Sequence, residues 1–369
     1  MRRCESSQTF VGLLANRLGV FMLVSAVVIS STQCLAETNG QKWHHLDNGT
    51  FRNPVGSAQG TATFGDMLSF FGRRMRDKPP QVPPTHVVPQ TQALQTYNAT
   101  AGQDTVTWLG HAAFLLRLNG KTVLTDPYLT KRAGRLGLGP NRYVEPGLAL
   151  ASLPPIDVVL VSHNHYDHLD ANTIEALPNK DRIHVVVPLG LGEFFEQRGY
   201  VNVIERDWYE STSIDGIEIQ VLPAIHFSRR GAFDRNRTLW GGFAIRTPTI
   251  KIYHSGDTGY GPVFKEIGER AGPFDLALVA IGAYLPTSIM KPVHLTPEEA
   301  LAVVDDVKAD VAVGMHWGTV QLTDEDPFEP PERFRAAASA RGWSANRAQV
   351  MRIGETKPLS KLLEKQSTN

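Results

Sequence analysis

Short apolar runs of strand length recur from Thr105 onward, and several are separated by stretches with helical periodicity. The segment TVTWLGHAAFLLRLNGKTVLTDP, residues 105–127, predicts strands that turn at Asn119 and Gly120. Seven further segments are typical of strands: IDVVLVS, HVVVP, IEIQVLPAIHF, GGFAIRT, IKIYHSG, DLALVAIG and DVAVGMHWG. The hydrophobic pattern therefore predicts a chain rich in β-structure.

Four segments between these strands have the spacing of helices: DANTIEAL, LGEFFEQRG, PVFKEIGERA and TPEEALAVVDDV. Strands that alternate with helices, together with a hairpin, are typical of an α/β fold. We therefore expect one mixed sheet, or two of them, covered by helices.

The first 36 residues differ from the rest of the chain. Three arginines precede the apolar stretch 20–29, which is too short to span a bilayer, and small residues lead up to Ala36. This pattern is typical of a secretory signal cut after Ala36. We expect residues 1–36 to be a signal peptide and the protein to be exported, to the periplasm or to a membrane surface. An uncleaved N-terminal anchor is the alternative.

We expect an N-terminal extension over residues 37–103 and one folded domain over residues 104–369. Within the extension, FGDMLSFFGRRMRD (residues 64–77) combines apolar positions at helical spacing with three arginines, as in a helix lying at a membrane interface. An ordinary helix that covers the core is the alternative. The segment 78–89 is rich in proline, which excludes a helix and predicts a strap laid over a surface.

The amino-acid composition limits which partners and which metal-ligand atoms can be expected. Hydrophobic residues make up 42% and charged residues 20%, as in a globular protein, and the formal net charge of zero provides no argument for a nucleic-acid partner. Both cysteines, Cys4 and Cys34, lie in the expected signal peptide. The remaining chain has no thiol, so any metal must be held by nitrogen and oxygen atoms.

One ten-residue segment, VSHNHYDHLD, concentrates histidines and aspartates directly after an apolar run. Its candidate ligands are His163, His165, Asp167 and His168. Imidazole and carboxylate groups suit zinc and similar divalent ions. The spacing lacks the i, i+4 pair of a helical H-E-x-x-H motif, which favours a loop at the end of a strand. Four ligands within six residues are better explained by two adjacent metals than by one tetrahedral ion.

Three more candidate ligands lie just beyond apolar strands. They are His226 after IEIQVLPAI, Asp257 after IKIYHSG, and His316 after DVAVGM. A single histidine or aspartate in such a place is usually an ordinary hydrogen-bonding residue. Their recurrence at strand ends, together with the dense cluster, predicts a common site at one rim of the sheets.

These motifs resemble the metallo-β-lactamase superfamily: SHNHYDHLD, the downstream His226, SGDTGY and MHWGT. Within it, the chain is most similar to the N-acylphosphatidylethanolamine-hydrolysing phospholipase D family, which TWLGHAAFLL, LTDP, LWGGF and HLTPEEA also fit in the same order. The resemblance extends from about Thr105 to Thr319. It implies an αββα sandwich, in which two mixed sheets are flanked by helices and a dinuclear metal site lies at one edge.

The resemblance also implies a cofactor, namely two zinc ions or similar divalent metals. The implied ligands are His163, His165 and His226 for one ion, Asp167, His168 and His316 for the other, and Asp257 as a bridge between them. A bridging carboxylate holds two ions about 3.5–4 Å apart, as in two-metal phosphoesterases. The β-lactamase members lack this bridge, so its presence favours a phosphodiester or lactone substrate.

Several neighbouring residues receive roles from the same resemblance. Asp257 is expected to help hold or deprotonate the attacking water, and His294 to contact the phosphate or assist the leaving group. Tyr166 and His294 match positions that face the substrate. Asp126 and His111 are expected to orient metal-site residues. The alternatives are a packing role for His111, a turn residue for Asp126, a packed ring for Tyr166 and an exposed loop histidine for His294.

The implied reaction is hydrolysis of N-acylphosphatidylethanolamine to an N-acylethanolamine and phosphatidic acid, with the phospholipid taken from a membrane surface. A lactonase or a soluble phosphodiesterase of the same fold is the first alternative. A di-iron oxidoreductase is a second, although such members typically carry a carboxylate where this chain has His165. A catalytically inactive binding module is the third. The sequence leaves the oligomeric state open, with a homodimer as one option.

Overall fold

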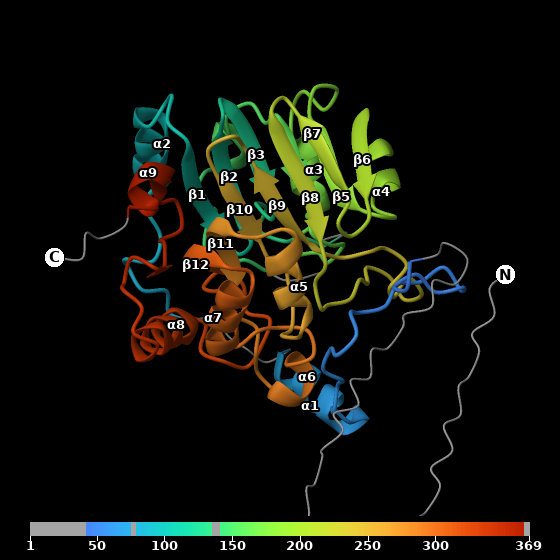
Figure 1. The fold of residues 1–369 in the computed structure, drawn as a ribbon. Coiled ribbons are helices and arrows are strands. Elements are labelled where there is room, and N and C mark those ends of the chain that lie inside the picture. The colour runs from blue at the N-terminus through green and yellow to red at the C-terminus, as the bar shows by residue number, and fades with distance from the viewer. Residues whose placement is uncertain (1–41, 75–78, 135–140, 365–369) are drawn as a thin grey trace, which may run out of the picture. The chain divides into compact units, whose positions relative to one another are not determined.

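The computed structural model describes residues 42–74, 79–134 and 141–364 of the chain (Figure 1). The predicted signal peptide lies outside the described residues. The folded part begins at Trp43 and forms one compact unit. Among the helices of the described ranges, none has both the length and the apolar character needed to cross a membrane.

Two mixed sheets, each of seven strands, face each other in this unit. In spatial order, the first sheet consists of β14 (Thr356–Pro358), β1 (Thr105–Gly110), β2 (Ala113–Leu118), β3 (Lys121–Thr125), β4 (Val158–Leu160), β5 (His184–Pro188) and β6 (Asn202–Arg206). The second consists of β13 (Ala348–Gln349), β12 (Ala309–Met315), β11 (Phe274–Ala280), β10 (Lys251–His254), β9 (Gly242–Arg246), β8 (Ile217–Leu222) and β7 (Ser211–Ile214). The predicted αββα sandwich is confirmed.

Each sheet contains an antiparallel half and a parallel half. Strands β1 to β3 form an antiparallel meander, and β3 to β6 run parallel. In the second sheet β7 to β10 are antiparallel and β10 to β13 are parallel. Asn119 and Gly120 have φ values of 50° and 75°, as a tight hairpin turn requires, and join β2 to β3 at the predicted place.

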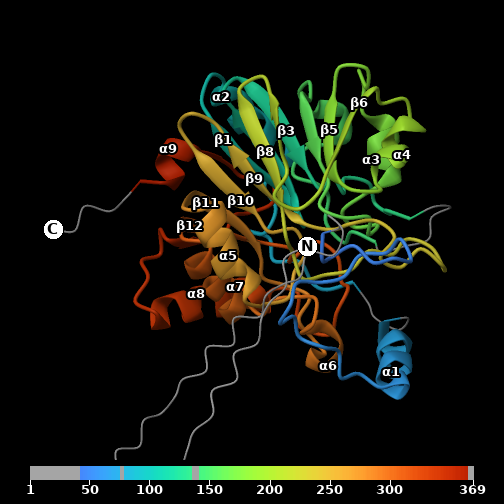
Figure 2. The same cartoon turned by 45° about the vertical axis from the view of Figure 1, so that its right-hand side comes forward.

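Helices cover the outer face of each sheet (Figure 2). The first sheet is covered by α2 (Gln90–Ala99), α3 (Ala171–Ala176) and α4 (Gly192–Glu196), and the second by α5 (Val263–Arg270), α7 (Pro297–Asp306) and α8 (Glu329–Ala340). Between the sheets, residues such as Phe114 and Phe243 are completely buried in one core. The remaining short helices are a 3-10 turn (Leu150–Ser152), α6 (Thr287–Met290) and α9 (Leu359–Leu362).

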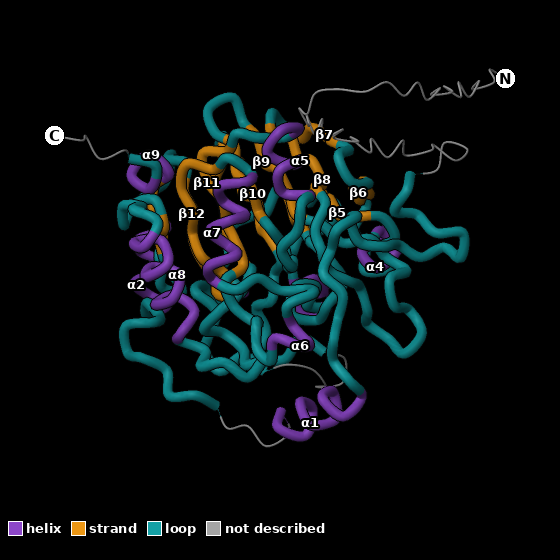
Figure 3. The backbone as a smooth tube through the Cα atoms, turned by 60° about the horizontal axis from the view of Figure 1, so that its bottom comes forward, coloured by secondary structure: helices purple, strands orange, loops and turns teal. Residues whose placement is uncertain are grey.

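The predicted interfacial segment contains helix α1 (Phe64–Arg74), and residues 75–77 of the prediction lie outside the described ranges. Figures 1 and 3 show α1 outside the two sheets. The side chains of Phe64, Leu68 and Phe71 are exposed, whereas Phe70 is only 5% exposed. One stripe of the helix therefore presents apolar side chains to the surroundings, and Phe70 belongs to the packed side.

The proline-rich strap contains no helix over its described residues 79–89. It lies against the loops at the site edge of the sandwich, because Val87 forms a bridge with Ile353 and His86 Nε2 donates to the carbonyl oxygen of Gly318 at 2.6 Å. Gly318 follows His316 by two residues. The strap thus supports the loop that carries a candidate ligand.

Candidate metal centre

The candidate ligands come together at one edge of the sandwich because each follows a strand that ends there. His163 lies three residues after β4, Asp257 three residues after β10, and His316 directly after β12. Strands β10 and β12 run parallel to each other through β11, so their carboxyl ends share an edge. The apolar strands behind these residues are buried, which places the polar loops at the boundary of the core.

Three histidines form the first ligand group. His163 Nε2 lies 2.8 Å from His165 Nδ1, and His226 Nε2 lies 3.1 Å from the same nitrogen. His163 and His226 are buried, whereas His165 is partly exposed. The three nitrogens converge on one point, and the cluster opens to the surroundings on the His165 side.

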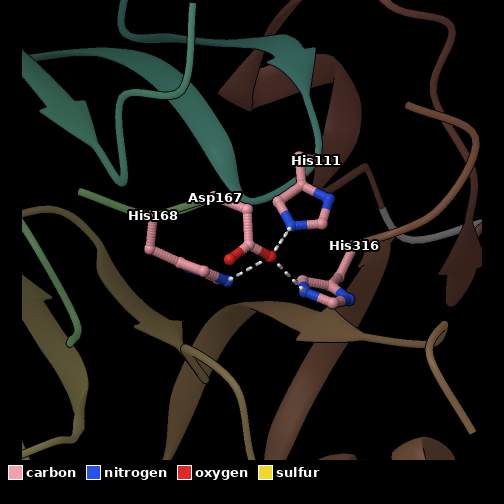
Figure 4. Close-up of side chains that lie close together, drawn as sticks. All are labelled: His111, Asp167, His168 and His316. Carbon is pink, nitrogen blue, oxygen red and sulfur yellow. Dashed lines mark hydrogen bonds and ion pairs between the residues drawn. The ribbon is translucent and has the colours of Figure 1, made fainter. Parts of the chain in front are cut away.

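The second group consists of Asp167, His168 and His316, with His111 beside them (Figure 4). Asp167 Oδ2 lies 3.7 Å from His168 Nε2 and 3.8 Å from His316 Nε2. His111 Nε2 lies 2.9 Å from the same oxygen, so the His111 ring is hydrogen-bonded to the Asp167 carboxylate. This is the orienting place that the sequence predicts for His111.

Asp257 stands between the two groups. Its Oδ1 lies 3.1 Å from His316 Nε2, and its Oδ2 lies 3.1 Å from His168 Nε2. The same Oδ2 is 3.9 Å from the Nε2 atoms of both His163 and His226. A single carboxylate therefore faces ligands of both groups, which is the arrangement that a bridging role needs.

These residues fit divalent metal ions. A tetrahedral ion with bonds of about 2.0–2.1 Å places its ligand atoms roughly 3.3–3.4 Å apart, within the range of separations seen here. Among the described residues, three buried atoms in the cluster, His168 Nε2, Asp257 Oδ1 and His316 Nε2, form no hydrogen bond of normal geometry, although Asp257 forms close ion pairs with both histidines. Buried polar atoms without partners are costly, and a bound cation would satisfy all three.

The electrostatics of the first ligand group and of Asp257 favour the protonation states that bind metal. Burial lowers the pKa of His163 and His226 well below the ordinary histidine value, and neighbouring imidazoles lower it further. Burial would raise the pKa of Asp257, but His168 and His316 hold it well below its usual range. Neutral imidazole and ionised carboxylate are the ligand forms of these side chains.

Hydrogen bonds to the second ring nitrogen orient three of the ligand histidines. His168 Nδ1 donates to Asp126 Oδ2 at 2.8 Å, and His226 Nδ1 donates to the carbonyl oxygen of Val293 at 2.9 Å. Ser162 Oγ lies 2.9 Å from His163 Nδ1 and donates to Asp126 Oδ2 at 2.7 Å. Such bonds select the tautomer that presents Nε2 to a metal. Asp126 therefore orients ligands of both groups and does more than form a turn.

Replacing Asp126 by asparagine is expected to weaken metal binding about 10–100-fold. The amide nitrogen would meet the N–H of His168 Nδ1 and favour the tautomer with Nε2 protonated, which cannot bind. Competition with a chromophoric chelator measures the affinity, and circular dichroism checks the fold. The matched variant Asp181→Asn, at an exposed position before β5, serves as control. Unchanged affinity in a folded Asp126→Asn protein would contradict this role.

The backbone is strained where the cluster is assembled. His111, Asp126 and His316 have φ values of 55°, 36° and 64°, in a region that residues with a side chain rarely adopt. Gly256, next to Asp257, has φ 57°, and a Cβ atom there would lie 2.6 Å from the carbonyl oxygen of Gly241. Gly256 thus allows the segment that carries Asp257 to approach the neighbouring loop.

The two predicted substrate-side residues differ in their positions. His294 stands at the rim of the cluster, with Nδ1 4.0 Å from Asp257 Oδ2 and a side chain that is 11% exposed. Tyr166 is partly exposed, and its hydroxyl donates to the carbonyl oxygen of Arg230 at 2.8 Å. The ring also lies beneath the Arg230 guanidinium, 4.1 Å from its carbon. Both contacts fix the position of the Tyr166 ring, and its role towards a substrate stays a prediction.

The sequence analysis missed supporting residues from distant segments. Asn53, in the N-terminal extension, accepts a hydrogen bond from the backbone N–H of His226 at 2.9 Å and another from Trp240 at 3.0 Å. Asn164, within the cluster itself, accepts from the backbone N–H of Arg229 at 2.8 Å. Neither residue has a local pattern that distinguishes it from an ordinary loop asparagine.

An αββα sandwich whose strand ends carry two groups of histidines joined by an aspartate defines the class of metallo-β-lactamase-fold proteins. The chain belongs to the β-lactamase superfamily: the family described as "Beta-lactamase superfamily domain" matches residues 121–317, more than half of the chain. The resemblance inferred from the sequence is thereby confirmed.

Two relatives illustrate the similarity. The chain is 41% identical over 248 residues to N-acyl-phosphatidylethanolamine-hydrolyzing phospholipase D 1 of Caenorhabditis elegans, covering 64% of this chain and 70% of the relative. It is 40% identical over 248 residues to an uncharacterized protein of Mycobacterium tuberculosis, covering 66% of each chain. The chain thus spans just under two thirds of the mycobacterial relative's length.

Solved structures show the same fold. The isothiocyanate hydrolase from Delia radicum gut bacteria aligns with a TM-score of 0.55 at 20% identity, over 69% of this chain and 98% of that one. The di-iron β-hydroxylase CmlA of Streptomyces venezuelae aligns with a TM-score of 0.51 at 21% identity, over 69% of this chain and 54% of that one. The fold is therefore shared by a hydrolase and a di-iron β-hydroxylase. Only the residues of the site can distinguish between these two kinds of activity.

Proposed function

We propose that the chain is a phosphodiesterase with two divalent metal ions, preferably zinc, that hydrolyses N-acylphosphatidylethanolamine in the manner of a phospholipase D. The observation that carries this proposal is the position of Asp257 between the two groups. Its Oδ2 lies 3.1 Å from His168 Nε2 of the second group and 3.9 Å from the Nε2 atoms of His163 and His226 of the first. A carboxylate that joins two ligand groups favours two-metal phosphoester chemistry.

The residues around the cluster have distinct tasks in this reaction. When bound, the two ions would polarise the phosphoryl oxygens and lower the pKa of water. His163, His165 and His226 would hold one ion, and Asp167, His168 and His316 the other, while Asp257 would hold both. Asp257 would also orient the attacking water. His294, at the rim, would donate a hydrogen bond to the phosphate or to the leaving group.

The substrate class is supported by the relatives and by the surface of α1. The Caenorhabditis elegans relative is named as a phospholipase D for N-acylphosphatidylethanolamine, and this chain is 41% identical to it over 248 residues. The exposed stripe of Phe64, Leu68 and Phe71 suits a protein that takes its substrate from a bilayer. A membrane phospholipid is therefore the partner we propose.

His165 argues against the di-iron alternative. Its Nδ1 lies within 3.1 Å of the Nε2 atoms of both His163 and His226, so an imidazole occupies the place where di-iron members typically carry a carboxylate. An all-nitrogen group of this kind suits zinc. A soluble phosphodiesterase or a lactonase would use the same ligands and differs only in its substrate.

The test is a hydrolysis assay coupled to metal analysis of the purified protein. Vesicles that contain N-acylphosphatidylethanolamine should yield N-acylethanolamine and phosphatidic acid, both identified by mass spectrometry, with two metal ions per active chain. Faster turnover of a lactone or of a water-soluble phosphodiester would favour the first alternative. An active enzyme with at most one tightly bound ion would refute the two-metal proposal.

Export is a separate proposal, supported by the basic start, the short apolar run and the small residues before Glu37. Protein recovered from its native host is expected to begin at Glu37. Intact-mass measurement decides this, and a mature chain that retains Cys4 would contradict it.

A further inference from the structure

The loop of residues 227–238, between β8 and β9 and named here the rim loop, carries an unusually exposed aromatic side chain. Phe233 at its tip is 94% exposed. A phenylalanine in water loses the favourable free energy that burial of its ring would provide. Two sets of contacts show that this exposure belongs to an ordered loop and not to a loose one.

The base of the rim loop is fastened to the metal cluster. The ring of Phe227 lies 4.6 Å from the ring of the ligand His165. The Arg230 guanidinium donates to the carbonyl oxygen of Asn164 at 2.9 Å, and Tyr166 donates to that of Arg230 at 2.8 Å. The loop therefore borders the partly exposed side of the site, where His165 and Tyr166 lie.

The tip of the loop is held by a tight turn. The Asp234 carboxylate accepts hydrogen bonds from the backbone N–H groups of Arg230 and Gly231, at distances between 2.8 and 3.2 Å. This carboxylate closes the turn next to Phe233. The ring is therefore directed outward by the backbone, so that it needs no reorganisation to enter an apolar phase.

Arginines surround the protruding ring. Arg229, Arg235 and Arg237 are exposed, and within the described ranges none of them forms an ion pair with an acidic side chain. The Arg235 guanidinium carbon lies 4.5 Å from the centre of the Phe227 ring, close to the cluster. Burial, and then the like charge of Arg229, lower the pKa of Arg235.

We propose that the rim loop docks the mouth of the metal site onto an anionic bilayer, with Phe233 inserted into the interface and Arg229 and Arg235 paired with lipid phosphates. The Phe233 ring protrudes beyond the surrounding arginines. This order matches a membrane, in which the apolar interior lies beneath an anionic surface. This inference deepens the proposed function, since it explains how a lipid phosphate reaches the ligands, and it adds a contact separate from α1.

The experiment measures by sedimentation how strongly the whole protein binds to vesicles. The vesicles contain no substrate, so no hydrolysis takes place. The vesicles consist of phosphatidylcholine alone or of phosphatidylcholine mixed with phosphatidylglycerol. The variants are Phe233→Ser and the double variant Arg229→Gln/Arg235→Gln. Val201→Ser is the matched control, because Val201 is 69% exposed and precedes β6 at the opposite edge of the sandwich.

We expect Phe233→Ser to weaken binding to both kinds of vesicle about tenfold. The double arginine variant should weaken binding only to the vesicles with phosphatidylglycerol, by about fivefold for each arginine, and high salt should remove this difference. Val201→Ser should bind like the unmodified protein.

Three outcomes would overturn the proposal: unchanged binding of Phe233→Ser, an equal loss in Val201→Ser, or equal effects of the arginine variant on both kinds of vesicle. The first would also be expected if the loop recognised an acidic protein surface. Because these vesicles contain no N-acylated substrate, failure of the hydrolysis assay leaves the docking result intact, and failure of docking leaves the hydrolysis assay intact.

Discussion

Replacement of Asp257 by asparagine is expected to abolish hydrolysis, with a loss of roughly a thousandfold or more, and to reduce the metal content from two ions to one. Two-metal stabilisation of the transition state contributes several kcal/mol, and each 1.36 kcal/mol corresponds to a factor of ten in rate. The amide keeps the shape of the side chain but removes the charge that faces His168 and His316, both 3.1 Å away. Elemental analysis and turnover of a short-chain phosphodiester provide the two measurements.

The matched control for this experiment is Asp181→Asn, the same substitution at an exposed position before β5. It should leave metal content and turnover unchanged. His163→Ala removes a proposed ligand of the ion held by the first group and should also abolish hydrolysis. If Asp257→Asn retained two ions and normal turnover, Asp257 would not be the bridging ligand.

Substitution of Phe64, Leu68 and Phe71 by serine is expected to reduce hydrolysis of vesicle substrate about a hundredfold while hydrolysis of a short-chain phosphodiester persists. Full burial of each such side chain contributes roughly 1.5–3 kcal/mol, so partial insertion of three gives an effect of this size. The metal ligands belong to other elements of the chain. Vesicle sedimentation and parallel assays on the two substrates measure the difference.

Helix α1 contains its own control. Phe70 and Phe71 are neighbours in the sequence, but Phe70 is 5% exposed and Phe71 is 56% exposed. Phe70→Ser should therefore lower the melting temperature and reduce both activities, because truncation of a buried phenylalanine costs about 3–5 kcal/mol. If the triple variant also lost both activities equally, α1 would support the fold and not the membrane contact. Unchanged activity on both substrates would remove the helix from the mechanism.

The strands and helices that the sequence analysis found are those with a strong apolar pattern. Strands β4, β5, β11 and β12 are almost completely buried, so their sequences read as apolar runs. Strands β6 and β7 lie at sheet edges with partly exposed residues, and no apolar pattern marks them. Helices α2 and α8 were missed for a related reason: QTQALQTYNA is mostly polar, and EPPERFRAAASA opens with two prolines.

The sequence by itself determined which residues gather at the candidate site, because ligand chemistry has a local signature. The cluster from His163 to His168 lies within six residues, and Asp257 and His316 follow apolar strands that must end at an edge. The family resemblance predicts that these residues divide into two sets, and the structure brings them all together at one edge of the sandwich. The alternation of strands and helices predicted one mixed sheet or two, and the family resemblance implied that two sheets form a sandwich.

Only the tertiary structure decided which side chains serve the site from a distance and which face outward. The contacts of Asn53 and Val293 with His226 join segments 173 and 67 residues apart. The sequence likewise does not distinguish the exposed Phe233 from the other aromatic residues, most of which are buried. The packing of the whole fold determines where each side chain lies. Hydrophobic periodicity shows only which face of a helix or strand is apolar on average.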